Sequence, residues 1–548
     1  MNLLNEPWMP VRKRDGSREW VNPSQFSRPD IVAFDADRAD FNGALAQFAI
    51  GLLQTTTPVE RDREWRALFK EPPSSETLAE WFAPVSAAFE FDGDGARFMQ
   101  DFSLTAEEGT ACDIAALLIE APGEKTVKDN TDLFIKRDGV AQMCPHCAAA
   151  ALFTLQTNAP SGGAGHRTGL RGAGPLTTLL LASAGSSLWQ HLWLNVIERA
   201  RFFDETSSPV DATHLTFPWL APMSAIQKDG GETAPAQVHP AHVFWAMPRR
   251  IRFIAADRRG GKCGLCGRHN DTLLRSYRTR NYGLNYKGGW NHPLAPYYEL
   301  GEGWLPLHPQ PGGLGHRHWL AWLIGQTSER KTQRRARVVE HFLSERIRSA
   351  PGALRLWAFG FDIYNNMKAR CWYESTLPLY GLADCDAKTQ ETIEAEVGRW
   401  LDAAEQAGSQ LRGCIKDAWF KEAPSKADFS AIDAAFWGAT EAAFYGQLRS
   451  LIERASAGAE INALIVNTAW LRHLQDRATH LFDHQFVGTG PVAQQQPRRI
   501  AEAHQQLLRN LRGPKLREAL GLPVDAAQSA KRKAAARSNA KKQQGGRP

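Results

Sequence analysis

Cys144-Pro-His-Cys147 and Cys263-Gly-Leu-Cys266-Gly267 are two short motifs, over a hundred residues apart, whose pairing decides how the chain between them must fold. A CxxC turn points two thiolates toward one point in space, and two such turns complete the tetrahedral shell of four sulfurs that zinc favours. A full shell leaves no open position for a water molecule, so the ion would join distant segments rather than catalyse. We therefore predict a structural zinc site formed by Cys144, Cys147, Cys263 and Cys266.

Two alternatives to zinc stay open at this point. A single CxxC also occurs in thioredoxin-like redox proteins, and the two motifs are further apart than in small zinc modules. Cysteines without a ligand, or with a redox role, would also fit the pattern. The remaining four cysteines are scattered along the chain: Cys112, Cys371, Cys385 and Cys414.

The sequence around the two motifs predicts an irregular α+β domain. Up to about Met367, short β-like runs such as 243–245 and 251–254 are mixed with helical stretches and many Gly/Pro loops. A chain of 548 residues exceeds the size at which one core stops growing. We expect a large mixed N-terminal domain over residues 1–375, containing the zinc-stapled loop region.

The C-terminal part of the sequence predicts a helical bundle. Apolar residues recur there at steps of three and four, as on the buried face of a helix. Pro497 suits the first turn of the last of these helices. The predicted helices cover residues 393–415, 432–452, 464–482 and 497–511. Their short connections favour an antiparallel four-helix bundle over residues 380–515.

The net positive charge is concentrated at the C-terminal end. Of a net charge of +6, residues 531–548 contribute seven basic residues and no acidic one, which leaves 58 basic against 59 acidic residues elsewhere. We expect residues 516–548 to be a disordered basic tail, so nucleic-acid affinity of the folded part must come from local patches. The Arg-rich segment 330–348 predicts an amphipathic helix whose basic face is either solvated or in contact with phosphate.

A glycine-rich stretch over residues 158–174 is the most distinctive run in the chain. Its glycines permit positive φ and close approach of the backbone to a ligand. Backbone N–H groups, with His166, Arg167 and Arg171 nearby, would cradle phosphate or lie along a groove, and a flexible surface loop is the alternative. No Gly-Lys-Ser/Thr, HExxH, GxSxG or two-metal carboxylate pattern is found in the sequence, which lowers the odds of a nucleotide site or of catalysis.

The sequence predicts a cytoplasmic protein with no membrane partner. Its N-terminus lacks the basic and apolar regions of a signal peptide. The longest apolar stretch, 176–194, is interrupted by several polar residues and therefore indicates a buried segment rather than a spanning helix.

Four stretches together resemble one known family. They are Asn2-Leu-Leu-Asn-Glu-Pro-Trp-Met-Pro-Val11, the first CxxC with its Ala-rich helix start, Asn158-Ala-Pro leading into Gly-Leu-Arg-Gly172, and the second CxxC leading to Trp290-Asn-His-Pro. In order and spacing, and with a C-terminal helical bundle, the sequence is similar to the CasA family, the large subunit of the type I-E CRISPR complex Cascade. The resemblance implies a non-catalytic DNA-recognition subunit in antiviral defence. A zinc-containing nucleic-acid-processing enzyme is the alternative.

The resemblance also implies partners. The subunit would bind beside the crRNA 5′ end, with the backbone subunits, the small-subunit dimer and the 5′-end cap subunit. It would read the PAM of double-stranded target DNA, start strand separation and R-loop formation, and recruit a helicase-nuclease. Guide pairing then reads the target sequence, while the protein reads only a short flanking duplex. The family points to the minor groove, whose degenerate pattern would let several PAM sequences be tolerated.

Site residues are implied where the family's features match positions in this sequence. A glycine loop that approaches the minor groove corresponds to Gly162, Gly163, Ala164 and Gly165. The family's lysine finger falls at Asn281. This is a departure from the family pattern, and either Arg280 supplies the cation through a shift of one residue or the contact is altered.

Two further family loops are implied by the resemblance. The wedge that splits the duplex falls at Asn365, Asn366, Met367 and Lys368, with Met367 where a glutamine is expected. An apolar Met still unstacks a base step, whereas polar base contacts become doubtful. The loop at 130–137 resembles the one that anchors the subunit in the complex. Its anchors would be Leu133 and Phe134, with a plain buried hairpin as the alternative.

Overall fold

The chain divides into two compact units in the computed structural model. The structure describes residues 1–524 except 106, 133–136, 138, 164, 204–211, 224–226, 228–230, 255–259, 329–330, 351, 381–385, 423–427, 460 and 489–495. The mixed unit comprises Met1–Gln310 and Ala321–Leu379. The helical unit comprises Pro311–Leu320 and the described residues from Tyr380 onward.

The mixed unit contains several small antiparallel sheets rather than one large one. Their strand orders are β2-β1-β3, β4-β9-β6, β7-β8, β11-β10-β13-β12 and β15-β14-β5. The strands are β1 (Met9–Lys13), β2 (Arg18–Val21), β3 (Ile31–Phe34), β4 (Thr110–Asp113), β5 (Thr177–Leu181), β6 (Arg250–Phe253), β7 (Gly261–Lys262), β8 (His269–Asn270), β9 (Ser276–Arg280), β10 (Tyr297–Leu300), β11 (Gly303–Pro306), β12 (Gln326–Ser328), β13 (Lys331–Arg334), β14 (Arg355–Tyr364) and β15 (Lys368–Pro378).

The core of the mixed unit forms around two buried helices, α1 (Ala39–Thr56) and α5 (Pro145–Asn158), which pack against each other. Phe48 of α1 makes edge-to-face contacts with five aromatic rings, among them Phe153 of α5 and Trp245. The other helices of this unit are shorter: α2 (Asp62–Lys70), α3 (Ser75–Phe82), α4 (Glu124–Lys128), α6 (Leu188–Trp193), α7 (Arg199–Phe202) and α10 (Arg337–His341). The helix α9 (Trp319–Leu323) crosses the boundary between the units.

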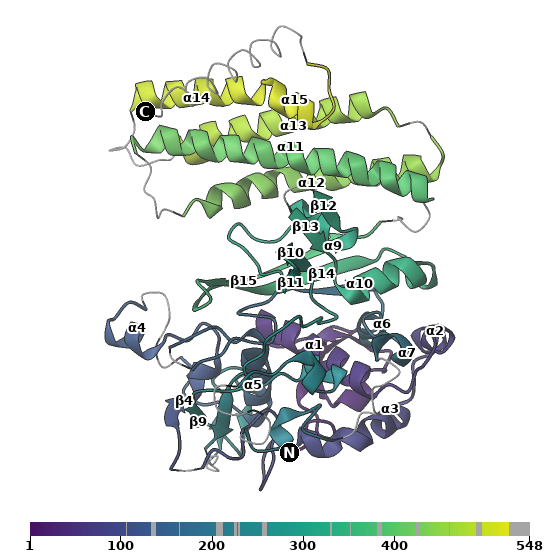
Figure 1. Cartoon of the computed structure of the whole chain (residues 1–548), viewed down its shortest axis with the longest axis vertical. Helices are drawn as coiled ribbons and strands as arrows, with labels where there is room; N and C mark the ends of the chain where they lie inside the picture. Colours follow the sequence, from purple (N-terminus) through teal and green to yellow (C-terminus); the bar gives the residue numbers. More distant parts are fainter. Residues whose placement is uncertain are drawn as a thin grey trace. The chain divides into compact units, whose positions relative to one another are not determined.

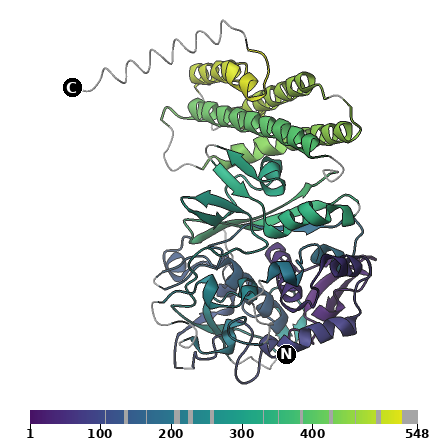
Figure 2. The same ribbon diagram turned by 45° about the vertical axis from the view of Figure 1, so that its right-hand side comes forward.

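The helical unit contains the long helices α11 (Ala387–Trp419), α12 (Ser430–Ser456), α13 (Ala463–His480) and α14 (Pro497–Leu511). The short helix α15 (Pro514–Ala519) follows them. In both Figure 1 and Figure 2, α11, α13 and α14 run side by side. Trp400 and Trp470 are fully buried in this unit. The indole N–H of Trp400 donates to Asn467 Oδ1 at 2.7 Å, and that of Trp470 donates to the Trp400 carbonyl at 3.0 Å. Both buried N–H groups are therefore satisfied.

The predicted α+β class and the C-terminal helices are confirmed. Three local predictions are wrong. Residues 516–524 do not belong to a disordered tail, because Pro514–Ala519 is helical and Leu516, Leu520 and Leu522 are buried. Residues 243–245 belong to a turn of 3₁₀ helix (Pro240–Phe244) and its cap rather than to a strand. The Arg-rich segment is not one helix with a basic face, because Lys331–Arg334 forms strand β13 and only Arg337–His341 is α-helical. Among the described residues, no helix is both long and apolar enough to cross a membrane.

Candidate metal centre and nucleic-acid interface

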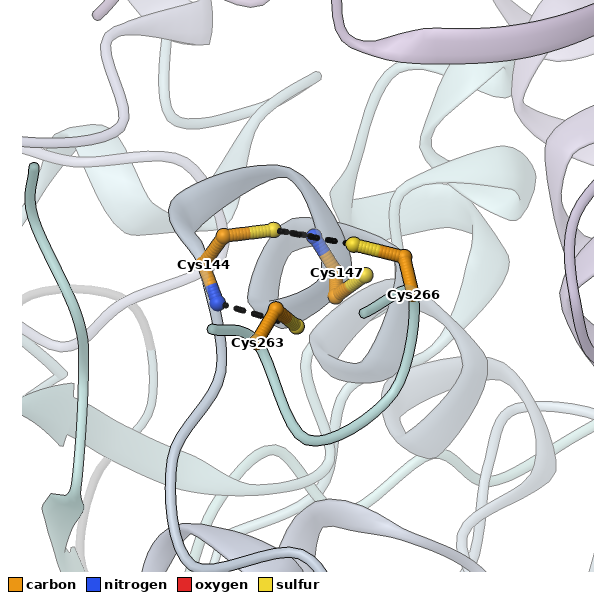
Figure 3. Close-up of side chains that lie close together, drawn as sticks. All are labelled: Cys144, Cys147, Cys263 and Cys266. Atoms are coloured by element: carbon orange, nitrogen blue, oxygen red, sulfur yellow. Dashed lines mark hydrogen bonds between the residues drawn. The ribbon is translucent and has the colours of Figure 1, made fainter. Parts of the chain in front are cut away.

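The four predicted cysteine ligands come together in one cluster. Their Sγ atoms all lie within 4.8 Å of one another, and those of Cys144 and Cys266 are 3.9 Å apart. Figure 3 shows the side chains converging from the start of a helix and from a loop. Zinc with four thiolates at about 2.3 Å needs neighbouring sulfurs roughly 3.8 Å apart, so the donor set and its spacing fit a tetrahedral zinc ion.

Local backbone geometry explains how each pair is held. Cys144 is the N-cap of α5, and its sulfur accepts the N–H of Cys147 at 3.5 Å. In the second pair, the N–H groups of Cys144 and Leu265 both point at Cys263 Sγ, at 3.3 and 3.5 Å. Gly267 closes that turn with a φ of +68°, a backbone conformation that glycine adopts without strain.

The four thiols of the cluster affect one another's ionisation. Hydrogen bonding, first of all from Cys144, lowers the pKa of Cys263 and brings that of Cys266 to about 7. The neighbouring sulfurs, first of all that of Cys144, raise the pKa of Cys147. Two of these thiols thus favour the thiolate and oppose ionisation of the others. A divalent cation bound by all four sulfurs would remove this conflict, because metal ligation deprotonates a thiol outright.

The glycine loop, residues 161–166, is held at both ends by one half-buried arginine. The guanidinium of Arg249 donates to the Pro160 carbonyl and to Nδ1 of His166. Burial, and then the charge of Arg249, lower the pKa of His166, which keeps the ring neutral and able to accept. A β-bridge between Gly162 and His166 closes the loop. Arg249 and this bridge therefore hold the described residues of the loop in place.

The predicted wedge is the turn of the β14–β15 hairpin. The N–H of Met367 donates to the Tyr364 carbonyl at 3.0 Å, and Asn365 and Asn366 have φ values of +49° and +58°. Two consecutive positive φ angles are typical of a type I′ hairpin turn, in which Asn is one of the few tolerated residues. Met367 stands at the tip with 53% of its surface exposed.

The glycine loop brings the separate candidate segments together. At one end, the N–H of Ser161 donates to the Asn366 carbonyl at 2.5 Å. At the other, Gly165 accepts the N–H of Tyr282 at 2.8 Å, and a Cβ at Gly165 would come within 2.7 Å of Asn281 Cβ. The wedge turn and the finger position are thus attached to opposite ends of one closed loop.

The cysteine cluster lies where the two segments that lead to the glycine loop and to Arg280 begin. The first cysteine pair begins α5, which spans about 21 Å at 1.5 Å per residue before the glycine loop starts. The second pair leads through β8 into β9, which ends at Arg280. Met143 and Leu274 exchange backbone hydrogen bonds of 2.9 and 2.8 Å beside the cluster, so both segments leave it in fixed register.

Arg280 does not point freely outward. Its guanidinium lies 3.2 Å from the carboxylate of Glu108, and both side chains are about half exposed. An exposed ion pair of this kind is worth about 1 kcal/mol or less, so Glu108 holds Arg280 only weakly. Lys368 is exposed at the base of the wedge turn.

Some residues singled out in the sequence are not described by the structure, and one has a different role from the predicted one. Ala164, Leu133, Phe134, Cys385 and the segment 525–548 lie outside the described residues. Arg171 was expected near a phosphate, but it is buried and donates to Thr177 Oγ1 at 3.0 Å and Gln47 Oε1 at 2.5 Å. Sequence reasoning missed the Arg249 clamp, and no motif surrounds Arg249 that could have revealed it.

The chain combines a mixed unit that contains a four-cysteine cluster with a helical unit. A family model described as "CRISPR-associated protein Cse1" matches residues 2–481. The chain therefore belongs to the Cse1 family of CRISPR-associated proteins.

Solved structures have the same fold. Cse1 of Thermobifida fusca is 15% identical, with a TM-score of 0.68 over 96% of this chain and 99% of that one. Thermus thermophilus "CasA (Cse1)" is 16% identical, with a TM-score of 0.66 over 93% and 99%. A chain from a "CRISPR RNA-guided surveillance complex" is also 16% identical, with a TM-score of 0.64 over 93% and 99%.

Proposed function

We propose that this chain is the large subunit of a crRNA-guided, type I-E Cascade complex in the cytoplasm. It reads the PAM of double-stranded DNA in the minor groove, begins strand separation and recruits a helicase-nuclease, without catalysing a reaction itself. Membership of the Cse1 family and the fold shared with a surveillance-complex chain support this proposal.

The observation that carries the proposal is the meeting of three segments at one loop. Ser161 and Gly165 connect the wedge turn to the segment Arg280–Tyr282 by main-chain hydrogen bonds. A glycine backbone and small polar side chains can enter the narrow minor groove, where only A·T against G·C is read well. Tolerance of several PAM sequences is the expected consequence.

The chemistry of each segment suits a part in this process. Gly162, Gly163 and Gly165 offer backbone to the groove, and Arg280 or Asn281 contacts its floor or a phosphate. Asn365, Asn366 and Lys368 position the exposed Met367, which enters a base step as apolar wedges do in other minor-groove proteins. Because the two Asn residues fix the turn, little ordering of the backbone is required on insertion.

The remaining assignments complete the proposal. Structural zinc bound by the four cysteines holds α5 and the β8–β9 segment in register. Leu133 and Phe134 anchor the subunit beside the crRNA 5′ end, near the backbone and 5′-end cap subunits. The helical unit contacts the small-subunit dimer.

The test uses the reconstituted complex with its guide. We expect Asn366→Gly combined with Met367→Gly to slow R-loop formation by about tenfold or more, while PAM-duplex binding changes by less than about threefold, since a wedge acts on unstacking. Leu300→Ala, at an exposed apolar position on the β10–β11 hairpin, is the control. Equal loss of binding and unwinding would reject the wedge assignment, and normal PAM discrimination without this subunit would reject the function.

A zinc-containing nucleic-acid-processing enzyme is the competing function. It predicts cleavage of labelled duplex by the purified chain with a divalent metal, lost on substitution of one of its own acidic residues. Intact duplex under these conditions favours the recognition subunit.

A further inference from the structure

Tyr282 is an aromatic residue held in an unusual backbone conformation on the surface. Its φ is +65°, and 52% of its surface is exposed. A bulky residue other than glycine rarely adopts positive φ, and such strain costs about 1–3 kcal/mol. The strain is fixed in place because the N–H of Tyr282 donates to the Gly165 carbonyl at 2.8 Å. The fold therefore keeps this ring at one position without burying it.

The surroundings of the ring are those of a stacking site. The Arg167 guanidinium lies 5.7 Å from the ring centroid, within the range of a cation–π contact. A Cβ at Gly165 would come within 3.1 Å of the ring, so only glycine lets the loop lie against it. Among the described residues, no hydrogen-bond partner reaches Arg167 Nε. Half of the surface of an aromatic residue is thus exposed beside the charge of a half-buried arginine.

Position links this pair to strand separation. Tyr282 is attached to Gly165, at one end of the glycine loop, while the wedge turn is attached to Ser161, at the other end. A duplex whose base step is opened by Met367 would release an unpaired base beside the loop. Exposed aromatic rings next to arginine are the usual means of holding such a base without reading its identity, because every base has a π face.

We propose that Tyr282 and Arg167 form a stacking site for the first base that becomes unpaired at the edge of the PAM. This inference rests on the proposed function, because it requires a duplex opened by the wedge. Stacking slows re-annealing of the opened pair, so the site acts after duplex recognition and before the guide has paired. It tolerates any base, as a subunit that meets many targets requires.

The experiment uses the assembled complex and target duplexes carrying 2-aminopurine at the first base next to the PAM, on one strand or on the other. Stacking on a tyrosine quenches this base, so wild-type complex should keep one of the two strands quenched after opening. Tyr282→Gly removes the ring and relieves the backbone strain, and should raise the emission of that strand several-fold. It should also slow R-loop formation by about 5- to 150-fold, the range expected from loss of one stacked base.

Two controls separate the possible outcomes. Tyr282→Phe keeps the ring and should keep both the quenching and the rate. Arg167→Gln should give a smaller rise in emission than Tyr282→Gly. PAM-duplex affinity, measured with a target that cannot pair with the guide, should change by less than about threefold, because the ring acts only on an opened duplex.

Three results would overturn the stacking site. They are equal emission from wild-type and Tyr282→Gly complexes on both strands, loss of duplex affinity with unchanged emission, and failure of Tyr282→Gly to enter the complex. The second result makes Tyr282 a duplex contact and the third a contact with a partner subunit, and both leave PAM reading intact. Failure of the proposed function would instead appear as wild-type complex that discriminates no PAM.

Discussion

The helical unit and the glycine-loop region of the mixed unit are built by opposite means. In α14, the buried residues Ala503, Leu507 and Leu511 follow at steps of four, and the helix covers the range that the sequence predicts. In the glycine-loop region, the contacts that attach the loop to the rest of the unit join residues far apart in sequence, such as Ser161 with Asn366 or Pro160 with Arg249. The helical unit depends on the pattern of apolar residues within each helix. The glycine-loop region depends on hydrogen bonds between residues that are distant in sequence.

This difference teaches where the two regions are vulnerable. A helix with an apolar stripe loses packing energy in proportion to the side chain that is removed. A loop held by a few distant contacts loses its geometry when one anchor is released, even if the fold survives. Substitutions in the helices should therefore change the free energy of unfolding, and substitutions in the loop should change DNA affinity.

Metal removal should give the largest effect and the clearest contrast. Chelation, or Cys263→Ser, should destabilise the mixed unit by as much as about 10 kcal/mol, the lower range of apparent zinc binding in small zinc modules. Region-resolved hydrogen exchange should then show loss of protection in α5 and β9, with α11–α14 still protected. Metal analysis should find one zinc per chain, and the control Cys371→Ser, at an exposed cysteine outside the cluster, should keep it. Loss of protection that begins in α11–α14 would contradict the role of the cluster.

Trp400→Ala should produce the reverse pattern. Trp400 is fully buried and bonded to Asn467, so its removal should destabilise the helical unit by about 3–5 kcal/mol. Denaturant unfolding followed by exchange should place the loss in α11 and α13, with unchanged metal content. Leu464→Ala, at a position 55% exposed on α13, should change stability by less than about 0.5 kcal/mol. A comparable loss at both positions would contradict the packing described for this unit.

Gly165→Ala should weaken DNA recognition without unfolding the chain. A positive φ of +82° strains alanine by roughly 1–2 kcal/mol, and the added Cβ meets Asn281. We expect a loss of about tenfold in PAM-duplex affinity, equal to about 1.4 kcal/mol. Gly95→Ala is a matched control, because its φ is +93° and nothing lies within 4 Å. If both variants bind DNA like wild type, Gly165 does not position the finger segment.

Acidification should give the smallest effect. The pKa of His166 is lowered from its ordinary value of 6.5 by burial and by Arg249, so the folded loop favours the neutral ring. Its contribution to loop stability is complete above pH 6.5 and is lost as the pH falls below 6.5 toward the lowered pKa. Duplex affinity of the complex should fall between pH 7.5 and pH 5.5, and the fall should be smaller for His166→Gln. An identical pH profile for both would remove His166 as the cause.

Prediction from the sequence succeeded where the spacing of residues along the chain fixes the local geometry. The CxxC turns predicted four sulfurs around one point, and the apolar steps predicted the long C-terminal helices. It failed for the Arg-rich segment, because pairing with β10 and β12 makes Lys331–Arg334 a strand. Arg346 in the same segment is buried against Trp65 and paired with Asp62 and Glu198. Such long-range partners leave no periodic signal.

By itself, the sequence determined the four cysteines of the candidate metal centre, the helical stripes and a glycine-rich stretch that permits positive φ. Each of these depends on residue type and local spacing. Only the tertiary structure decided that the glycine loop joins the wedge turn to Arg280–Tyr282, that Arg249 clamps it, and that Arg171 is buried. These contacts join groups that are distant in sequence, and they form only when the core of the whole unit packs together.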